Sequence, residues 1–288
     1  KSRTLVKEAM NLGSGKGIAR FIRDVFITTL IIESIGAVFS FFVFIKDFPW
    51  YKAMGISAFH SVSAFNNAGF DILGTGKSFI RHTFERFAKM IPAEHFLVVT
   101  NRRYKELVLE HIPELNESQV LCEPIGRNTA PCIAYAAYTL QKLNPEAQMV
   151  VTPADHLILG EEEFRAIIGE CMEFAAQRGA LLTVGIKPTR PDTGYSYIQV
   201  SDNQQISKVK CFTEKPNLEL AQTFLQCGEF FWNSGIFVWS VEAIIEAFKK
   251  YLPEHHSLFS DLQPALGTEA EQEAVERVFA ECRAISID

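Results

Sequence analysis

Residues 119–156 read QVLCEPIGRNTAPCIAYAAYTLQKLNPEAQMVVTPADH and contain one complete strand–helix–strand pattern. The apolar run Gln119–Cys122 predicts a strand, the alanine-rich stretch 129–143 predicts a helix, and Met149–Val151 predicts a second strand. Outward from this stretch, the same alternation continues from residue 80 to the end of the chain. It predicts an α/β fold with a largely parallel central sheet and helices on both faces.

Polar strings that contain Gly or Pro lie next to the expected strands, where ligands of such sheets bind. Further strands are expected at Phe96–Thr100, Leu181–Val184, Tyr197–Val200 and Ile236–Trp239, and further helices near 81–90, 103–111, 161–177, 218–227, 241–251 and 268–283. The five strings are EPIGRNTAP (123–131), TPADH (152–156), VGIKPTRPDTGYSY (184–197), FTEKP (212–216) and FWNSGIFVW (231–239). Taken singly, each has a structural interpretation. Asn128 or Thr129 would cap the helix at 129–143, and Asp155 would form a turn.

Charge divides the chain into two segments. The 288 residues carry a net charge of −6, which argues against a protein that binds nucleic acid through bulk positive charge. The six cysteines form no CxxC pair, so neither a zinc site nor a disulfide framework is expected. Residues 1–76 hold eight Lys/Arg and five Asp/Glu, whereas residues 77–288 hold 20 and 29. We place a domain boundary between these two segments.

The first segment contains a long apolar run. Residues 25–45 read VFITTLIIESIGAVFSFFVFI, in which Glu33 is the one charged residue. A helix of this length spans roughly 31 Å, close to the thickness of the bilayer hydrocarbon. The run therefore predicts a transmembrane helix, and a buried core helix is the alternative. Basic residues concentrate before the run, which places the N-terminus in the cytoplasm under the positive-inside rule.

The stretch that follows, AFHSVSAFNNAGFDILG at 58–74, contains FHSVSAFNNAGFD. This string resembles the pore loop, at about 58–72, of the membrane subunit of Trk/Ktr-type potassium uptake systems. The resemblance covers about residues 1–72. It implies that Gly69 is an ion-filter glycine, which exposes backbone carbonyls to the ion. Four such repeats surround the pore in that family, so we expect no transport from a chain that holds one.

In this order and together, the five polar strings resemble the mannose-1-phosphate guanylyltransferase family of sugar-phosphate nucleotidylyltransferases, from about residue 70 to 288. The resemblance implies a Rossmann-like nucleotidyltransferase sheet. It implies transfer of GMP from GTP to mannose 1-phosphate, giving GDP-mannose and pyrophosphate. GTP and mannose 1-phosphate would then be the partners, with no nucleic acid. Mg²⁺ is the implied cofactor, since it is a hard cation that bridges phosphate oxygens.

The same resemblance implies roles for single residues. Asp155 and Asp288 are the expected magnesium ligands, and Asp155 and Lys215 are the expected catalytic residues. The expected substrate-binding residues are Arg127, Asn128, Thr129, Gly194, Tyr195, Glu214 and Asn233. In this set the RNT loop lies near the nucleotide, Glu214 and Asn233 contact the sugar, and the lysine faces a phosphate.

The family also begins with a strand and a glycine-rich loop of the form GGxGTRLxP, and no such string occurs in residues 1–76. The resemblance thus implies a sheet without its first strand, poor turnover and reduced stability. The resemblance to the transporter ends at about residue 72, where the resemblance to the guanylyltransferase has already begun. This direct change from one family to the other suggests a chimera of two genes. Two alternatives are a fragment of a potassium transporter and a membrane-tethered nucleotide-sugar binding module without catalysis. Residues 77–288 are expected in the cytoplasm, or at the membrane if the fusion is real.

Overall fold

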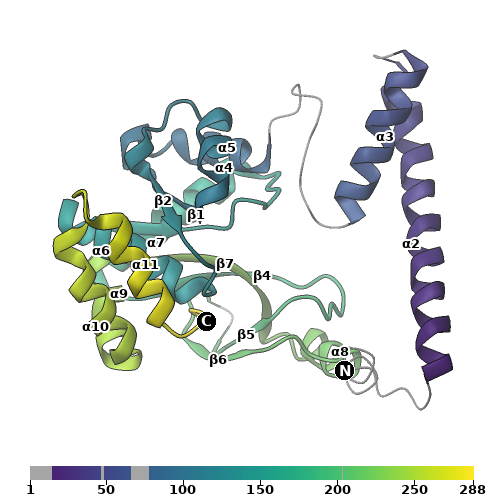
Figure 1. Cartoon of the computed structure of the whole chain (residues 1–288). Helices are drawn as coiled ribbons and strands as arrows, with labels where there is room; N and C mark the ends of the chain where they lie inside the picture. Colours follow the sequence, from purple (N-terminus) through teal and green to yellow (C-terminus); the bar gives the residue numbers. More distant parts are fainter. Residues whose placement is uncertain (1–14, 47–48, 66–77, 203) are drawn as a thin grey trace. The chain divides into compact units, whose positions relative to one another are not determined.

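The computed structural model describes residues 15–46, 49–65, 78–202 and 204–288. The chain divides into two compact units, Lys1–Phe79 and Ile80–Asp288 (Figure 1). The described part of the first unit consists of α2, Gly15–Phe44, and α3, Trp50–Phe65, which pack against each other. The predicted pore loop at 58–72 therefore starts inside a helix, because residues 58–65 belong to α3. Its remainder, including Gly69, lies outside the described residues.

The transmembrane helix predicted at residues 25–45 is not supported. A helix does form over most of this stretch, as α2. Within the described ranges, however, no helix has both the length and the apolar character that a bilayer crossing requires. The resemblance to potassium transporters, and the membrane tether and chimera inferred from it, have no support either.

Seven strands form two sheets in the described part of the second unit (Figure 1). β1, Val98–Asn101, pairs in parallel with β2, Val120–Glu123. The second sheet has five strands, and all of its pairings are antiparallel: β3 (Gln148–Val151), β4 (Leu182–Ile186), β5 (Tyr197–Val200), β6 (Val209–Thr213) and β7 (Phe230–Ser240). The predicted largely parallel sheet is therefore wrong. Parallel neighbours need a long crossover, and β4, β5 and β6 follow one another without a helix between them.

β7 is the centre of the second sheet. β4 lies along one of its edges, and β3 and β5 lie one after the other along the opposite edge. This follows from the register, because Val238 pairs with both Val150 and Leu182, while Trp232 pairs with both Ile186 and Tyr197. β6 pairs with the far edge of β5. On the edge of β7 that pairs with both β5 and β3, the N–H of Asn233 still donates to the carbonyl of Ser196 at 2.9 Å, so the ladder is interrupted only at residues 234–236.

Helices cover both faces of this sheet. On one face, Phe237 and Trp239 join a core formed with α6 (Thr129–Leu143), α9 (Val241–Tyr251), α10 (Pro253–Leu262) and α11 (Glu271–Glu281). On the other, Ile236 and Val238 pack with α4 (Phe79–Ala88) and α7 (Glu161–Arg178). Successive residues of β7 thus enter opposite cores, as the period of a strand requires.

Two smaller cores complete the unit. α5, Lys105–His111, packs with α4 on β1 and β2, and α8, Leu218–Cys227, packs on Tyr197 and Trp232. Short 3₁₀ helices occur at Ala93–His95, Arg102–Tyr104, Glu117–Gln119 and Gln263–Ala265. The predicted bounds of α6, α8 and α9 are confirmed, whereas β6 was not predicted, because Lys210 and Thr213 leave it without a clear apolar run.

Candidate functional site

The interruption in the shared edge of β7 brings this strand against the loop that follows β3. Gly235 has a φ of 68°, in the left-handed region, and a Cβ at this position would lie 3.4 Å from the ring of Pro153. The side-chain oxygen of Asn233 accepts a hydrogen bond of 3.0 Å from the N–H of Gly235. A glycine is needed here because most other residues would be strained at this φ. The result is close contact between the Asn233–Gly235 segment and the loop that carries Asp155.

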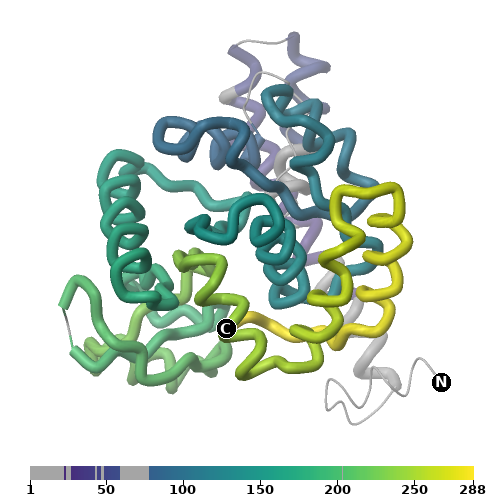
Figure 2. The backbone as a smooth tube through the Cα atoms, turned by 90° about the vertical axis from the view of Figure 1, so that its left-hand side faces the viewer, coloured from purple at the N-terminus to yellow at the C-terminus, as the bar shows by residue number. Residues whose placement is uncertain are grey.

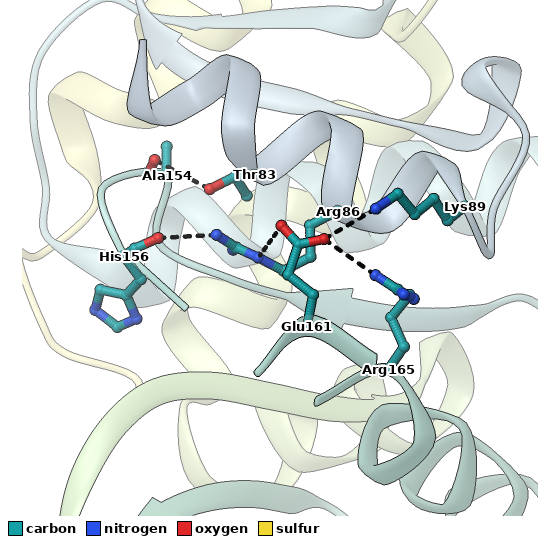
Figure 3. A network of polar contacts seen from close by, with 7 residues as sticks. All are labelled: Thr83, Arg86, Lys89, Ala154, His156, Glu161 and Arg165. Atoms are coloured by element: carbon teal, nitrogen blue, oxygen red, sulfur yellow. Dashed lines mark hydrogen bonds and ion pairs between the residues drawn. The ribbon is translucent and has the colours of Figure 1, made fainter. Parts of the chain in front are cut away.

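Asp155 is exposed on the loop Thr152–His156, and α4 holds the backbone on both sides of it (Figure 3). The hydroxyl of Thr83 donates to the carbonyl of Ala154 at 3.2 Å. The Nη2 of Arg86 donates to the carbonyl of His156 at 3.0 Å. These two hydrogen bonds to the carbonyls on either side of Asp155 restrict the backbone of the loop. They therefore fix the position from which the carboxylate of Asp155 extends.

The guanidinium of Arg86 lies under this loop, with 1% of its side chain exposed. Glu161, at the start of α7, lies 4.0 Å from its Nε and also binds Lys89 at 3.0 Å and Arg165 at 3.2 Å (Figure 3). Burial lowers the pKa of Arg86, and the hydrogen bond from Lys89 lowers the pKa of Glu161. Nε and Nη1 of Arg86 make no hydrogen bond to any described residue. One carboxylate therefore faces three cations behind the Asp155 loop.

The last residues of the chain return from α11 to the loop before α6 (Figure 2). The N–H of Ile285 donates to the carbonyl of Arg127 at 3.2 Å, and the N–H of Ala130 donates to the carbonyl of Ile285 at 3.1 Å. The N–H of Ile287 donates to the hydroxyl oxygen of Thr129 at 2.9 Å. These bonds fix the terminal segment against the RNT loop.

Asp288 reaches β7 from this segment. Its Oδ1 accepts a hydrogen bond of 2.9 Å from the amide Nδ2 of Asn233. Its Oδ2 accepts one of 3.0 Å from the hydroxyl of Ser286. Hydrogen bonds thus connect Thr129, Asp288 and Asn233, which are far apart in the sequence. The contact between Gly235 and Pro153 places the Asp155 loop beside this group.

Arg127 and Asn128 have structural partners. The Nε and Nη2 of Arg127 donate to the carbonyls of Phe279 and Ala280, at 2.8 Å and 3.0 Å, near the end of α11. Asn128, with a φ of 68°, caps α6, and its side-chain oxygen accepts from the N–H of Thr129 at 2.8 Å. The interpretation of Asn128 as a helix cap is confirmed. Contact of the RNT loop with a nucleotide stays a prediction.

The loop with Gly194 and Tyr195 lies next to the β7 interruption. The N–H of Gly194 donates to the carboxylate of Asp192 at 2.8 Å, and this bond lowers the pKa of Asp192. The exposed ring of Tyr195 lies 5.2 Å from the ring of Trp232. The guanidinium of Arg190 also lies over the ring of Trp232, 5.1 Å from its centre. Because Trp232 immediately precedes Asn233, this loop borders the predicted sugar contact.

Glu214 and Lys215 follow β6, and both are exposed. Among the described contacts, none joins them to Asp155, Asn233 or Asp288. Their predicted roles in sugar and phosphate binding therefore stay predictions.

Sequence reasoning missed Thr83 and Arg86 in this region, and it assigned no role to Glu123 at the end of β2. Thr83 and Arg86 hold the Asp155 loop, and a signal was available, because RHTFERF places Arg86 beside the buried Phe87 on an amphipathic helix. A charged group in such a position needs a polar partner. Glu123 ends β2, and burial raises its pKa to about 7. Its Oε1 is buried and has no hydrogen-bond partner among the described residues.

Comparison with known proteins adds to this geometry. The sequence profile of the family described as "Nucleotidyl transferase" matches residues 70–280. A mannose-1-phosphate guanylyltransferase of Escherichia coli K12 is 40% identical over 174 residues, which are 57% of this chain and 36% of that protein. The xanthan biosynthesis protein XanB of Xanthomonas campestris pv. campestris B100 is 38% identical over 178 residues, 61% of this chain and 38% of that protein. The chain thus spans under two fifths of the length of either relative.

A solved structure is also similar. The crystal structure from Thermus thermophilus described as a mannose-1-phosphate geranyltransferase is 31% identical, with a TM-score of 0.65. The match covers 74% of this chain and 60% of that one.

Proposed function

The chain belongs to the nucleotidyl transferase family, and on this premise we propose that residues 80–288 form the substrate site of a mannose-1-phosphate guanylyltransferase. This enzyme transfers GMP from GTP to mannose 1-phosphate. One observation carries the proposal. Hydrogen bonds join Asp288, Asn233 and the Thr129 loop at the interruption of β7, beside the held loop of Asp155. The identity to guanylyltransferases supports the choice of substrates.

The proposed reaction needs no covalent intermediate on the protein. An oxygen of the sugar phosphate attacks the α-phosphorus of GTP, and the bond from that phosphorus to the leaving pyrophosphate oxygen breaks. The protein's contribution is then to position the two substrates and to neutralise charge. In this proposal Asn233 and Glu214 hold sugar hydroxyls, Lys215 faces a phosphate, and Tyr195 borders the sugar.

Family members generally use a divalent metal, and we propose Mg²⁺ here, with Asp155 and Asp288 as its protein ligands. No three His, Cys, Asp or Glu side chains of the described residues gather closely enough to hold an ion alone. This donor set still fits, because Mg²⁺ is usually held by one or two carboxylates together with substrate phosphates and water. When bound, the ion neutralises charge on the reacting phosphates.

Binding of the product tests the proposal more directly than turnover does. Residues 1–76 contain no GGxGTRLxP string, so we expect slow chemistry even where the sugar nucleotide binds. GDP-mannose binding is measured by calorimetry with Mg²⁺ and with EDTA, and pyrophosphate release is measured in parallel. We expect GDP-mannose to bind saturably and only with Mg²⁺ present, and we expect UDP-glucose to bind with lower affinity.

Two variants and one control refine the test. D155N and D288N each remove one proposed ligand charge, and we expect each to weaken metal-dependent binding at least tenfold, or about 1.4 kcal/mol. D261N removes the same charge from an exposed position on α10 and should bind as the parent chain does. Mn²⁺ binding, followed by electron paramagnetic resonance, gives a second readout. Unchanged binding in both site variants would contradict the proposed metal ligands.

A further inference from the structure

α10 carries one polar side chain among the residues that it buries. His255, Phe259 and Leu262 are the buried residues of this helix, and their spacing places them on one face. The ring of Phe259 lies 5.9 Å from the ring of Phe279 on α11, in an edge-to-face arrangement. Packing alone would favour an apolar residue at position 255, because a buried imidazole costs free energy unless it is hydrogen-bonded.

The hydrogen-bond partner of His255 lies just beyond α11. The Nε2 of His255, whose side chain is buried, lies 2.8 Å from the carbonyl oxygen of Arg283. A carbonyl oxygen can only accept, so Nε2 carries a proton and donates it to this bond. Cys282, which ends α11, has an extended backbone, with φ −68° and ψ 141°. Arg283 therefore begins the segment 283–288, which leads to Asp288.

Backbone groups of every second residue hold this segment. The carbonyl of Arg283 accepts from α10, the N–H and the carbonyl of Ile285 bond to the RNT loop and the first turn of α6, and the N–H of Ile287 donates to Thr129. Ile285 and Ile287 also pack against the α6 core. Successive side chains of an extended chain point to opposite sides, so the next one, that of Asp288, points away from this core and reaches β7.

The bond from His255 matters because packing holds the start of the segment weakly. The side chains of residues 283–284 are exposed, so they bury little surface between α11 and Ile285. Without the donor on His255, the carbonyl of Arg283 would turn toward water, which is an adequate partner for it. The backbone between α11 and Ile285 would then be free to change its path, and this freedom would extend to Asp288.

We propose that His255 is a positioning residue of the substrate site, and that its bond to Arg283 fixes the path along which the segment brings Asp288 to β7. This inference rests on the proposed function, in which Asp288 is a metal ligand. The other anchors of the segment belong to the RNT loop and α6, where the nucleotide is expected. His255 comes from α10 instead, and among the described contacts none joins it to Asp288 or Asn233. It therefore acts on Asp288 through the backbone of the segment.

Variants of the full chain separate this positioning role from a general effect on stability. H255L suits the apolar face of α10 and removes the donor, and H255M, a second variant without the donor, must reproduce its result. H255Q keeps an N–H group near the position of Nε2. The matched control is H256L. It removes the neighbouring histidine of the same helix, whose Nδ1 lies 2.6 Å from the hydroxyl of Tyr138 on α6.

Hydrogen exchange and GDP-mannose binding are the two measurements. We expect the amides of Ile285 and Ile287 to exchange about fivefold faster in H255L than in the parent chain, as for the loss of one hydrogen bond. Mg²⁺-dependent binding of GDP-mannose should weaken by about the same factor. H255Q should restore both properties, and H256L should change neither. In a D288N background, H255L should weaken binding no further, because both substitutions then act on one interaction.

Each other outcome overturns the proposal. Binding or exchange in H255L equal to that of the parent chain would exclude a positioning role. A further loss of binding when H255L is added to D288N, or the same losses in H256L, would indicate an effect on the whole fold. Failure of H255Q to restore binding would exclude the hydrogen bond as the cause. If the parent chain itself did not bind GDP-mannose, the proposed function would fail, whereas the exchange data, which need no ligand, would still show whether His255 holds the segment.

Discussion

Replacing Arg86 with methionine tests whether α4 holds the Asp155 loop. R86M keeps a long, unbranched side chain in the buried position and removes the guanidinium that donates to the carbonyl of His156 at 3.0 Å. K89M is the matched control. It also removes one cation from Glu161, with which Lys89 pairs at 3.0 Å, but Lys89 makes no described contact with the loop.

The expected loss of stability is the difference of two terms. A hydrogen bond from a charged donor contributes about 1.5–3 kcal/mol. Against this, R86M removes two buried nitrogens, Nε and Nη1, that lack hydrogen-bond partners among the described residues, which returns about 1 kcal/mol. The pair with Glu161 adds little, because it spans 4.0 Å and Glu161 keeps Lys89 and Arg165. We therefore expect R86M to lower the free energy of unfolding by about 0.5–2 kcal/mol, and K89M by less than about 0.5 kcal/mol.

Urea unfolding measures the free energies, and hydrogen exchange reports on the loop itself. We expect the amides around Asp155 to exchange at least fivefold faster in R86M than in K89M, while α9 and α10 keep their protection. A conservative variant, R86K, retains the charge and should restore part of the stability but not the loop protection. If R86M and K89M had the same stability and the same exchange at residues 154–156, the positioning role of Arg86 would be refuted.

Two other predictions concern single residues, Glu123 and Gly235. Burial raises the pKa of Glu123 from 4.5 to about 7, so folding favours its protonated form, and its contribution to stability, full below about pH 4.5, is lost as the pH rises through 7. The difference in unfolding free energy between E123Q and the parent chain should thus shift in favour of E123Q by about 1–2 kcal/mol from pH 5 to pH 8. This is less than the limit of about 3 kcal/mol because Glu123 keeps some contact with solvent. If the difference between the urea midpoints of the two proteins were the same at pH 5 and pH 8, the prediction would be contradicted. G235A and G228A both place alanine at a positive φ and should each lose about 1–2 kcal/mol, measured by urea unfolding. Only G235A meets a neighbour, Pro153 at 3.4 Å, so only G235A should also weaken GDP-mannose binding; equal binding by the two variants would argue against a site at this contact.

Local patterns in the sequence predicted much of the second unit. The stretch TAPCIAYAAYTLQKL was predicted as a helix with the bounds it has in the structure, and Asn128 was predicted as one of two residues that could cap it. Both depend on interactions within a few residues, namely helical periodicity and a side chain bonded to a nearby N–H. The polar strings were also sufficient to predict the family, since residue types in order need no tertiary information.

Strand direction could not be predicted in the same way. A short apolar run such as Leu182–Ile186 has the same pattern whether its neighbour runs parallel or antiparallel. The choice depends on which strands meet at β7 and on the loops between them. The apolar stretch at 25–45 illustrates a related limit, because its pattern alone was compatible with a buried helix and with a membrane span.

What the sequence by itself determined is the alternation of strands and helices apart from β6 and α10, the bounds of α6, α8 and α9, and the strings that identify the family. Only the tertiary structure decided how those strings meet. The bond from Arg86 to His156 spans 70 residues, and the bond from Asn233 to Asp288 spans 55. It also decided that the sheet is divided between β1 and β3. The physical reason is that hydrogen bonding and burial act between groups close in space, whereas sequence patterns record only neighbours along the chain.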